Sequence, residues 1–599
     1  MKYPASIGKF CPTVLAGVAS FCTYMCFFAG GQEESAFLQS LMGTIFFVVY
    51  LAFTRTSFFN VRIRFLLPVS LLVGGVWATG KLLFSKEPLT GSSLSAPVLL
   101  LIELIGFTAL VWCMGKLLYG LLETAPGRIK KRSLLDFFDK KPMLTILILM
   151  LLLWLPHLLL KYPSGMNVDS LDAIDYSLGL QDKNYNPIMY TVIMGAFFKI
   201  GLWFGIPNLG IFAFNVVLWL LLAFAVAKGY VFLTKIGGAD WSKIFYILFF
   251  AFSPFVTGYV GNCIKDMPYI SFMLLFLVQL GCWLMEPAHF WHNKKMLVLT
   301  GLAGYGMAIF RNNGLYILLI MLALMLAVEL HRARGQGSGI YKRALCLLLV
   351  GLLPILTNVV AQKLMGSENA SSRRESFSLP FQQTARLVLE HPELISEEER
   401  AIIDRVLPYD KLAQEYNPVI SDPVKNSYRE ECTAQDRIEY MKLWFKQFFK
   451  APWTYIKAVL AQNYFLFYPE SSNYYYYYSC THYDFAFPDQ IVWHIGSPEY
   501  ISDILGWYYQ NFFERLHELP ILYFLNNMST YNIVLLILLC FALTKRDKKM
   551  LLIMLPALVT LLGVPLGPCI WSHPRYVFPV IYSLPLLFGL YARDRSNEN

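Results

Sequence analysis

The sequence predicts an all-α polytopic membrane protein with about 14 transmembrane helices and one large, mostly helical soluble segment. Apolar residues make up 56% of the 599 residues and charged residues only 15%, against roughly 25% charged in an ordinary soluble domain. The mean hydropathy is +0.49. A soluble fold of this length could not bury so much apolar surface, whereas a lipid bilayer accommodates it. Disordered, collagen-like and small disulfide-rich proteins are excluded by the same composition.

Each predicted crossing is an apolar stretch near the length that a helix needs to span a bilayer, about 20 residues. Flanking aromatic side chains are expected to extend the shorter stretches. The first stretch follows Lys2 and Lys9, but it is long for a signal peptide and more spans follow, so we interpret it as the first helix. The predicted spans are 13–30, 37–53, 65–84, 98–118, 143–160, 209–233, 244–262, 267–285, 296–310, 314–330, 344–362, 531–543, 550–566 and 577–592.

Basic residues between the spans predict the topology, because cytoplasmic loops are rich in Lys and Arg. With the N-terminus inside, four crossings place the basic segment 128–141 in the cytoplasm, and a fifth leaves 161–186 outside. If the apolar stretch 187–204 also crossed, every later basic cluster would face outward. If it lies along the outer interface, as Lys199 and Trp203 favour, all of them face inward. We therefore predict an interfacial helix there and two cytoplasmic termini.

This topology divides the chain into four regions. Residues 1–142 form a four-helix membrane extension that ends in the basic cytoplasmic loop. Residues 143–362 form a membrane core with a first outer loop at 161–208, residues 363–530 form an extracytoplasmic domain, and residues 531–599 hold the last three transmembrane helices. The net charge of +10 lies in short runs between spans, so the expected partner is the lipid bilayer rather than nucleic acid.

The extracytoplasmic segment is expected to be mostly helical, without alternating strands. Ser396 and Glu399 have the spacing of a capping box, and 438–448 has the apolar periodicity of an amphipathic helix. Cys432 and Cys480 lie in this polar segment, and the sequence leaves open whether they pair.

Four sets of polar residues collect at the predicted outer ends of the spans, where charge near hydrocarbon is costly and marks functional candidates. In the first, VDSLDAIDYSLGL, Asp169 and Asp172 are three residues apart and share a helical face. This spacing suits a general base with a neighbouring acid that tunes it or binds a cation. The alternative is a solvated helix start with Asp169 as the N-cap.

Two further sets occupy tight outer turns. In GNCIKDMP, Lys265 and Asp266 have almost no loop to expose them, so they must pair or face a cavity, although an exposed Lys–Asp pair contributes little. In FRNNGLY, Arg311, Asn312 and Asn313 link two spans. The Arg311 guanidinium could hold a phosphate through parallel hydrogen bonds, or the turn could simply anchor the helix at the interface.

The fourth set is WSHPRYVFP, where His573 and Arg575 end the last outer link, between aromatic residues typical of the membrane interface. A tyrosine tract in the soluble segment, with Tyr474, Tyr475 and Tyr476, offers faces that suit sugar rings but equally suit membrane interfaces and helix packing. Together the sets place cations and carboxylates at one outer level, as chemistry on an anionic lipid head group requires.

Several enzyme classes are not indicated. There is no GxxxxGK[ST] motif of an ATP-driven motor, no HExxH motif of a standard zinc protease and no GxSxG nucleophile elbow. No CxxC pair occurs either, so no metal site is predicted.

The order of these motifs resembles the GT-C membrane glycosyltransferases, which include the protein mannosyltransferases and the lipid A aminoarabinose transferase. A span, MNVDSLDAIDY in the first outer loop and the Pro-led YNPIMYTVIMGAFFKIG resemble their start. The KD turn, RNNGLY, LPFQQTARLV and RYVFP resemble GT-C-like proteins of Gram-positive bacteria. The resemblance covers a core of about ten spans from residue 143 onward, and the first four lie outside it. This chain has Asn186-Pro187 where those relatives usually have His-Pro, so a role of that His does not carry over.

The resemblance implies an enzyme, a polyprenyl-phosphate-dependent glycosyltransferase of the bacterial cytoplasmic membrane with its active site outside. Its partners would be a polyprenyl-phosphate sugar lipid and an extracytoplasmic acceptor. Asp169 would be the general base, assisted by Asp172. Some members use a divalent cation, but no ligand set in this chain requires one. The phosphate would be held by Lys265, Arg311 and Arg575, with Asp266, Asn312, Asn313 and His573 in support.

Three alternatives remain at this point. A transporter or flippase of a lipid-linked glycan would explain the spans and outer charges, but not the large outer domain. A surface-polysaccharide polymerase or ligase would differ in using lipid-pyrophosphate donors. A non-enzymatic membrane scaffold would leave the charged residues at the outer helix ends without a reason.

Overall fold

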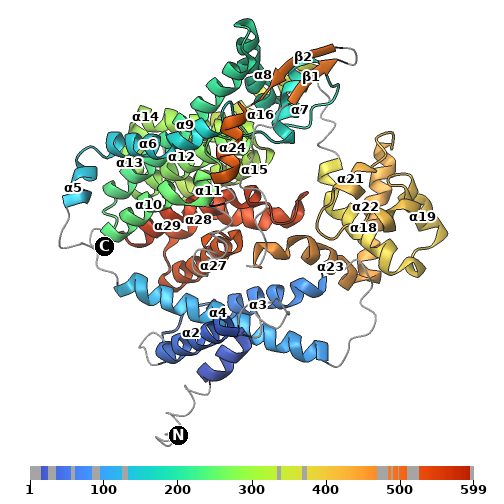
Figure 1. The fold of residues 1–599 in the computed structure, drawn as a ribbon, viewed down its shortest axis with the longest axis horizontal. Coiled ribbons are helices and arrows are strands. Elements are labelled where there is room, and N and C mark those ends of the chain that lie inside the picture. Colours follow the sequence, from blue (N-terminus) through green and yellow to red (C-terminus); the bar gives the residue numbers. More distant parts are fainter. Residues whose placement is uncertain are drawn as a thin grey trace, which may run out of the picture.

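The computed structural model describes residues 15–24, 36–54, 61–83, 95–124, 133–333, 339–366, 374–468, 483–487, 490–496, 498–508, 511 and 525–593. Their regular structure is helical except for one antiparallel hairpin, β1 (Tyr483–Phe487) and β2 (Gln490–Ile495) (Figure 1). The predicted all-α membrane class is confirmed. The expectation of no strands in the outer segment is wrong, because the hairpin lies within it.

Eight of the described helices are long and apolar enough to cross a membrane, which confirms a multi-pass membrane protein. They are α4 (Ser95–Thr124), α6 (Pro142–Leu160), α9 (Pro207–Lys235), α12 (Asp266–Met285), α15 (Asn312–Arg332), α16 (Ile340–Met365), α27 (Met528–Lys545) and α28 (Lys548–Gly563), which η5 (Val564–Leu566) continues.

The other six predicted spans fall on shorter helices or shorter described stretches, so the count of fourteen crossings stays a prediction. These are residues 15–24, α2 (Ala36–Thr54), α3 (Leu66–Leu83), α10 (Asp240–Phe252) with α11 (Pro254–Thr257), α14 (Lys294–Phe310) and α29 (Phe578–Tyr591). The stretch predicted to be interfacial is the helix α8 (Ile188–Trp203). Its position along the bilayer surface also stays a prediction.

The predicted span 244–262 is broken rather than continuous. Pro254 has no backbone N–H to donate and restricts the residue before it, so α10 ends at Phe252 and the short α11 follows. Lys161, buried at the end of α6, donates to the backbone oxygens of Gly258 and Val260 just beyond the break. The break therefore ties the C-terminal end of α6 to the segment that leads into α12.

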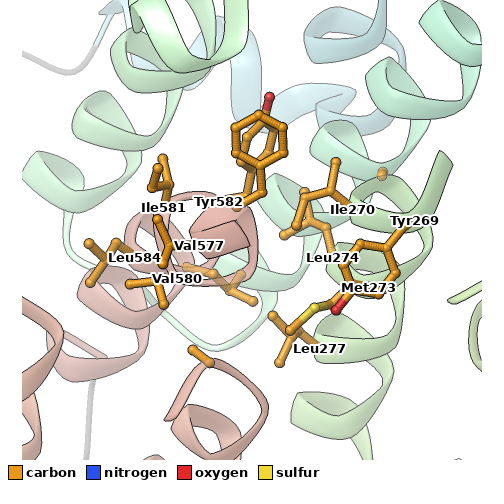
Figure 2. Close-up of a cluster of buried hydrophobic side chains, with 14 of the residues drawn as sticks. Tyr269, Ile270, Met273, Leu274, Leu277, Val577, Val580, Ile581, Tyr582 and Leu584 are labelled. Atoms are coloured by element: carbon orange, nitrogen blue, oxygen red, sulfur yellow. The ribbon is translucent and has the colours of Figure 1, made fainter. Parts of the chain in front are cut away.

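The centre of the bundle is the packing of α12 against α29. Tyr269, Ile270 and Met273 on α12 lie in one buried cluster with Tyr582 and other apolar residues of α29 (Figure 2). α12 begins at Asp266, and α29 begins at Phe578, shortly after Arg575. Their packing therefore brings the starts of the two helices to the same end of the bundle.

The first part of the outer segment has a hydrophobic core of its own, around Phe381, Leu407 and Tyr440. The predicted capping box of Ser396 and Glu399 is confirmed at the start of α19. Figure 1 shows this group beside the main bundle. Its helices are α18 (Ser378–Glu390), η2 (Pro392–Leu394), α19 (Glu397–Asp404), α20 (Tyr409–Glu415), α21 (Asp422–Asn426) and the predicted amphipathic helix α22 (Ala434–Lys450).

From α23 (Pro452–Asn463) onward the outer segment returns to the bundle. The residues of η3 (Tyr464–Leu466) belong to the main core, and the Tyr464 ring lies against Gly80 on α3. The remaining elements are α5 (Ser133–Lys140), α7 (Val168–Leu178), α13 (Pro287–His292), α24 (Glu499–Tyr508), η5 (Val564–Leu566) and η6 (Pro574–Val577).

The close packing of α14 against α15 can be tested at Gly314, in the FRNNGLY turn. A Cβ atom there would lie 2.1 Å from the backbone oxygen of Met307 on α14. Gly314→Ala should therefore lower the unfolding free energy by about 1–3 kcal/mol, as overpacking does, measured by thermal unfolding in nanodiscs. Gly563→Ala is the matched control, because nothing lies within 4 Å of its added methyl group. Equal stability of the two variants would contradict the close approach of α14 and α15.

Candidate functional site

The site begins at the N-terminus of α7. The side-chain oxygen of Asn167 accepts hydrogen bonds from the backbone nitrogen of Ser170 at 3.1 Å and from its hydroxyl at 2.9 Å. Asn167 is thus the N-cap, and the alternative interpretation of Asp169 as the N-cap is wrong. Asp169 lies instead in the first turn, where the helix dipole favours a negative charge.

Three donors converge on one oxygen of Asp169. Arg575 Nη1 lies 2.8 Å from Oδ2, Lys265 Nζ lies 3.2 Å from it, and Asn167 Nδ2 donates to it at 3.3 Å. Lys265 also donates to Asn186 Oδ1 at 2.8 Å, and Asn186 Nδ2 donates to the backbone oxygen of Asp169 at 2.8 Å. Three residues predicted from separate motifs, Asp169, Lys265 and Arg575, therefore meet at one point.

A second ion pair lies beside this cluster. Arg311 Nη1 is 2.7 Å from Oδ1 of Asp266, whose side chain is fully buried. The same nitrogen donates to the backbone oxygen of Arg575 at 3.2 Å. Arg311 is therefore occupied by Asp266 and acts on the position of Arg575.

Backbone pairing brings α7 next to α12. The nitrogen of Gly165 donates to the oxygen of Gly261 at 2.8 Å, and the nitrogen of Cys263 donates to the oxygen of Gly165 at 3.1 Å. Asn215 on α9 donates to the same Gly261 oxygen at 2.9 Å. Asp169 and Lys265 each follow this paired segment by a few residues, so their side chains come within reach.

The segment that carries Arg575 is attached to the group of helices from α18 to α22 through the loop after α20. The nitrogen of Trp571 donates to the oxygen of Val419 at 3.0 Å, within an antiparallel bridge of Ile420 and Ile570. Gln382, from the LPFQQTARLV motif, donates to the oxygen of Asn417 at 2.8 Å and so supports the outer strand of this bridge. We call these contacts the clasp.

Ser572 and His573 come directly after the clasp in the sequence. Ser572 is buried with a φ of 60°, a left-handed backbone that a non-glycine residue adopts only where its surroundings enforce it. His573 is buried as well. Burial lowers its pKa well below the ordinary value, and Arg575 adds to this effect, so the imidazole is neutral.

The remaining predicted residues do not join the cluster. Asn312 and Asn313 are exposed in the first turn of α15. Tyr474, Tyr475, Tyr476 and Cys480 lie outside the described residues. Cys432 is described, and its buried thiol donates to the hydroxyl of Tyr428 at 3.1 Å.

Within the described residues, no group of three or more His, Cys, Asp or Glu side chains could hold a metal ion. The side chains around Asp169 that can contact an anion include those of Lys265, Arg575 and Asn167.

The two carboxylates of α7 have opposite electrostatic environments. Burial would raise the pKa of Asp169, but Lys265 and Arg575 outweigh it and hold that pKa well below its usual range. Burial, together with Asp169 and Asp175, raises the pKa of Asp172 to about 6. Carboxylates whose pKa values are driven apart are suited to different acid–base roles. The site can thus bind an anion beside a carboxylate that exchanges a proton near neutral pH.

Sequence reasoning missed Asn167 and Asn186, because neutral amides give no charge signal near hydrocarbon. Asn167 could have been found by its position three residues before Ser170 at a helix start, where Asn is a favoured cap. Asn186 occupies the position where the resemblance expects His, and it bridges Lys265 to the Asp169 backbone.

Asp172 gives a prediction for stability against pH. A carboxyl whose pKa is raised in the folded protein destabilises the fold when ionised, so its cost grows as the pH rises from 3.8 to about 6. Asp172→Asn should therefore have a higher thermal midpoint than the wild type at pH 7.5, and the difference should shrink steadily below pH 6 and approach zero only below the unfolded pKa of 3.8. A difference that is constant over this range would contradict the raised pKa.

Comparison with known proteins places the chain in a family. No curated protein and no solved structure matches it. A family model described as "Family of unknown function (DUF6020)" matches residues 180–599, more than half of the chain. The match includes Lys265, Arg311 and Arg575, and it begins after Asp169. The chain belongs to the DUF6020 family.

Proposed function

We propose that the protein is an integral membrane glycosyltransferase of the GT-C type. It transfers a sugar from a polyprenyl-phosphate carrier to an acceptor on the outer face of the bacterial cytoplasmic membrane. The observation that supports this most is the convergence of Lys265 and Arg575 on Asp169, at one end of a buried apolar bundle. A lipid phosphate needs cations at that level, and a sugar transfer also needs a carboxylate there.

The cations stabilise the negative charge that develops on the phosphate leaving group. As the acceptor oxygen attacks the anomeric carbon, the bond from that carbon to the phosphate oxygen breaks, and its electron pair stays on the phosphate. Lys265 and Arg575 stabilise this developing charge, and Arg311 holds Arg575 in position through its backbone oxygen. A guanidinium binds phosphate through two parallel hydrogen bonds, which also orients the leaving group.

The carboxylates accept the proton of the acceptor hydroxyl. The acceptor hydroxyl loses its proton to Asp169, the carboxylate in direct contact with both cations and hence nearest to the expected phosphate. Asp172, three residues further along α7, orients the acceptor or relays the proton. Its pKa of about 6 suits exchange near neutral pH.

The test is turnover of purified protein in nanodiscs with a panel of polyprenyl-phosphate sugars, scored by release of polyprenyl phosphate. Arg575→Gln should lower turnover by roughly 100-fold or more, because one charged donor to the transition state is lost. Lys411→Gln is the matched control, since it removes an exposed cation on α20 in the outer domain, and it should behave as the wild type.

Three results would count against this function. Equal turnover by Arg575→Gln and the wild type would remove the phosphate role of the cluster. Turnover with lipid-pyrophosphate donors only would favour a polysaccharide polymerase or ligase. Movement of labelled lipid between leaflets without any sugar transfer would favour a flippase.

A further inference from the structure

One oxygen of Asp169 occupies the position that an oxygen of a bound phosphate would take. Its Oδ2 receives Arg575 at 2.8 Å, Lys265 at 3.2 Å and Asn167 at 3.3 Å. Several cationic and amide donors around one oxygen form an oxyanion-binding arrangement. In the structure described here, this arrangement is filled by the protein's own carboxylate.

Lys265 and Arg575 can also bind a stronger anion than a carboxylate. Both contact Asp169, and Arg311 is paired with Asp266. The Arg575 and Lys265 side chains are only 12% and 14% exposed, so solvent screens them little. A phosphate offers more acceptor oxygens than a carboxylate and can therefore compete for both cations.

The two ion pairs of the site differ in how easily they exchange. Asp266 is 0% exposed, and removing its partner would leave a buried charge, so this pair stays closed. Asp169 is 24% exposed and lies in the first turn of α7. When it is released from the cations, its carboxylate remains at a helix N-terminus, which favours a negative charge.

We propose that Asp169 is a built-in counter-ion that the phosphate of the lipid donor displaces, so that the carboxylate becomes available as a base only in the loaded site. This proposal rests on the proposed function. It imposes an order: the phosphate binds first and takes Lys265 and Arg575, and Asp169 then accepts the proton of the acceptor hydroxyl. In the empty site the same carboxylate is held by two cations and is a weak base.

The test is the affinity for a C15 prenyl phosphate, measured with purified protein in phosphatidylcholine nanodiscs. In the wild type, the Asp169 carboxylate competes with the ligand for Lys265 and Arg575. The apparent affinity is therefore the intrinsic affinity multiplied by the fraction of sites in which Asp169 has released these cations. Asp169→Asn should bind the prenyl phosphate about tenfold more tightly than the wild type and should lose turnover. Asp410→Asn is the matched control and should bind within about twofold of the wild type, because Asp410 is an exposed carboxylate on α20 that pairs with Arg400 and not with these cations.

Further ligands and variants distinguish binding of the phosphate from binding of the lipid tail, and they distinguish the counter-ion proposal from the proposed transferase function. Inorganic phosphate and the C15 prenyl alcohol show whether the anion alone or the lipid tail alone is bound. If the wild type turns over lipid-phosphate sugars but Asp169→Asn binds prenyl phosphate no more tightly than the wild type, the counter-ion proposal is overturned and the transferase function stands. Wild-type protein that prefers the alcohol to the phosphate would overturn both.

Asp169→Ser replaces Asp169→Asn if the latter does not fold. A second measurement needs no variant at the tested residue: the infrared difference spectrum of the wild type on binding prenyl phosphate. It should show the carboxylate stretch of an ion-paired group moving to that of a released one, and the change should persist in Asp172→Asn. A spectrum without a carboxylate change would also overturn the counter-ion.

Discussion

The burial of Asp266 is the constraint on which the end of the bundle around Asp169 depends. It is the first residue of the central helix α12 and is fully buried, so its charge is costly unless a cation meets it. Arg311 supplies that cation from the turn between α14 and α15. The same guanidinium donates to the backbone of Arg575, ahead of α29. One buried charge thus ties three separate parts of the chain together, and the cluster around Asp169 is built on them.

The parts of this arrangement that depend on local sequence could be predicted. Helical spans follow from apolar length, and the predicted ones coincide with helices because backbone groups in a bilayer must bond within their own segment. Asp169, Lys265 and Arg575 were identifiable because charges next to hydrocarbon are energetically costly and therefore mark functional candidates. The exception within the spans is 244–262, where Pro254 breaks the helix.

The parts that depend on distant contacts could not be predicted. Asp169 and Arg575 are 406 positions apart, and nothing in either motif says that they touch. Arg311 was expected at the phosphate, yet its pairing with Asp266 follows from the packing of α12. The amides Asn167 and Asn186 escape a search for charge, and Asn312 and Asn313 are exposed although the neighbouring Arg311 reaches Asp266.

The clasp has a consequence for how the protein can change over time. The strand-like contact between 419–420 and 570–571 is made by backbone atoms, which every amino acid other than proline supplies in full. Substitutions of side chains in residues 374–468, apart from Gln382, can therefore leave this contact in place. That group of helices can change its surface and still stay attached to the segment that carries Arg575.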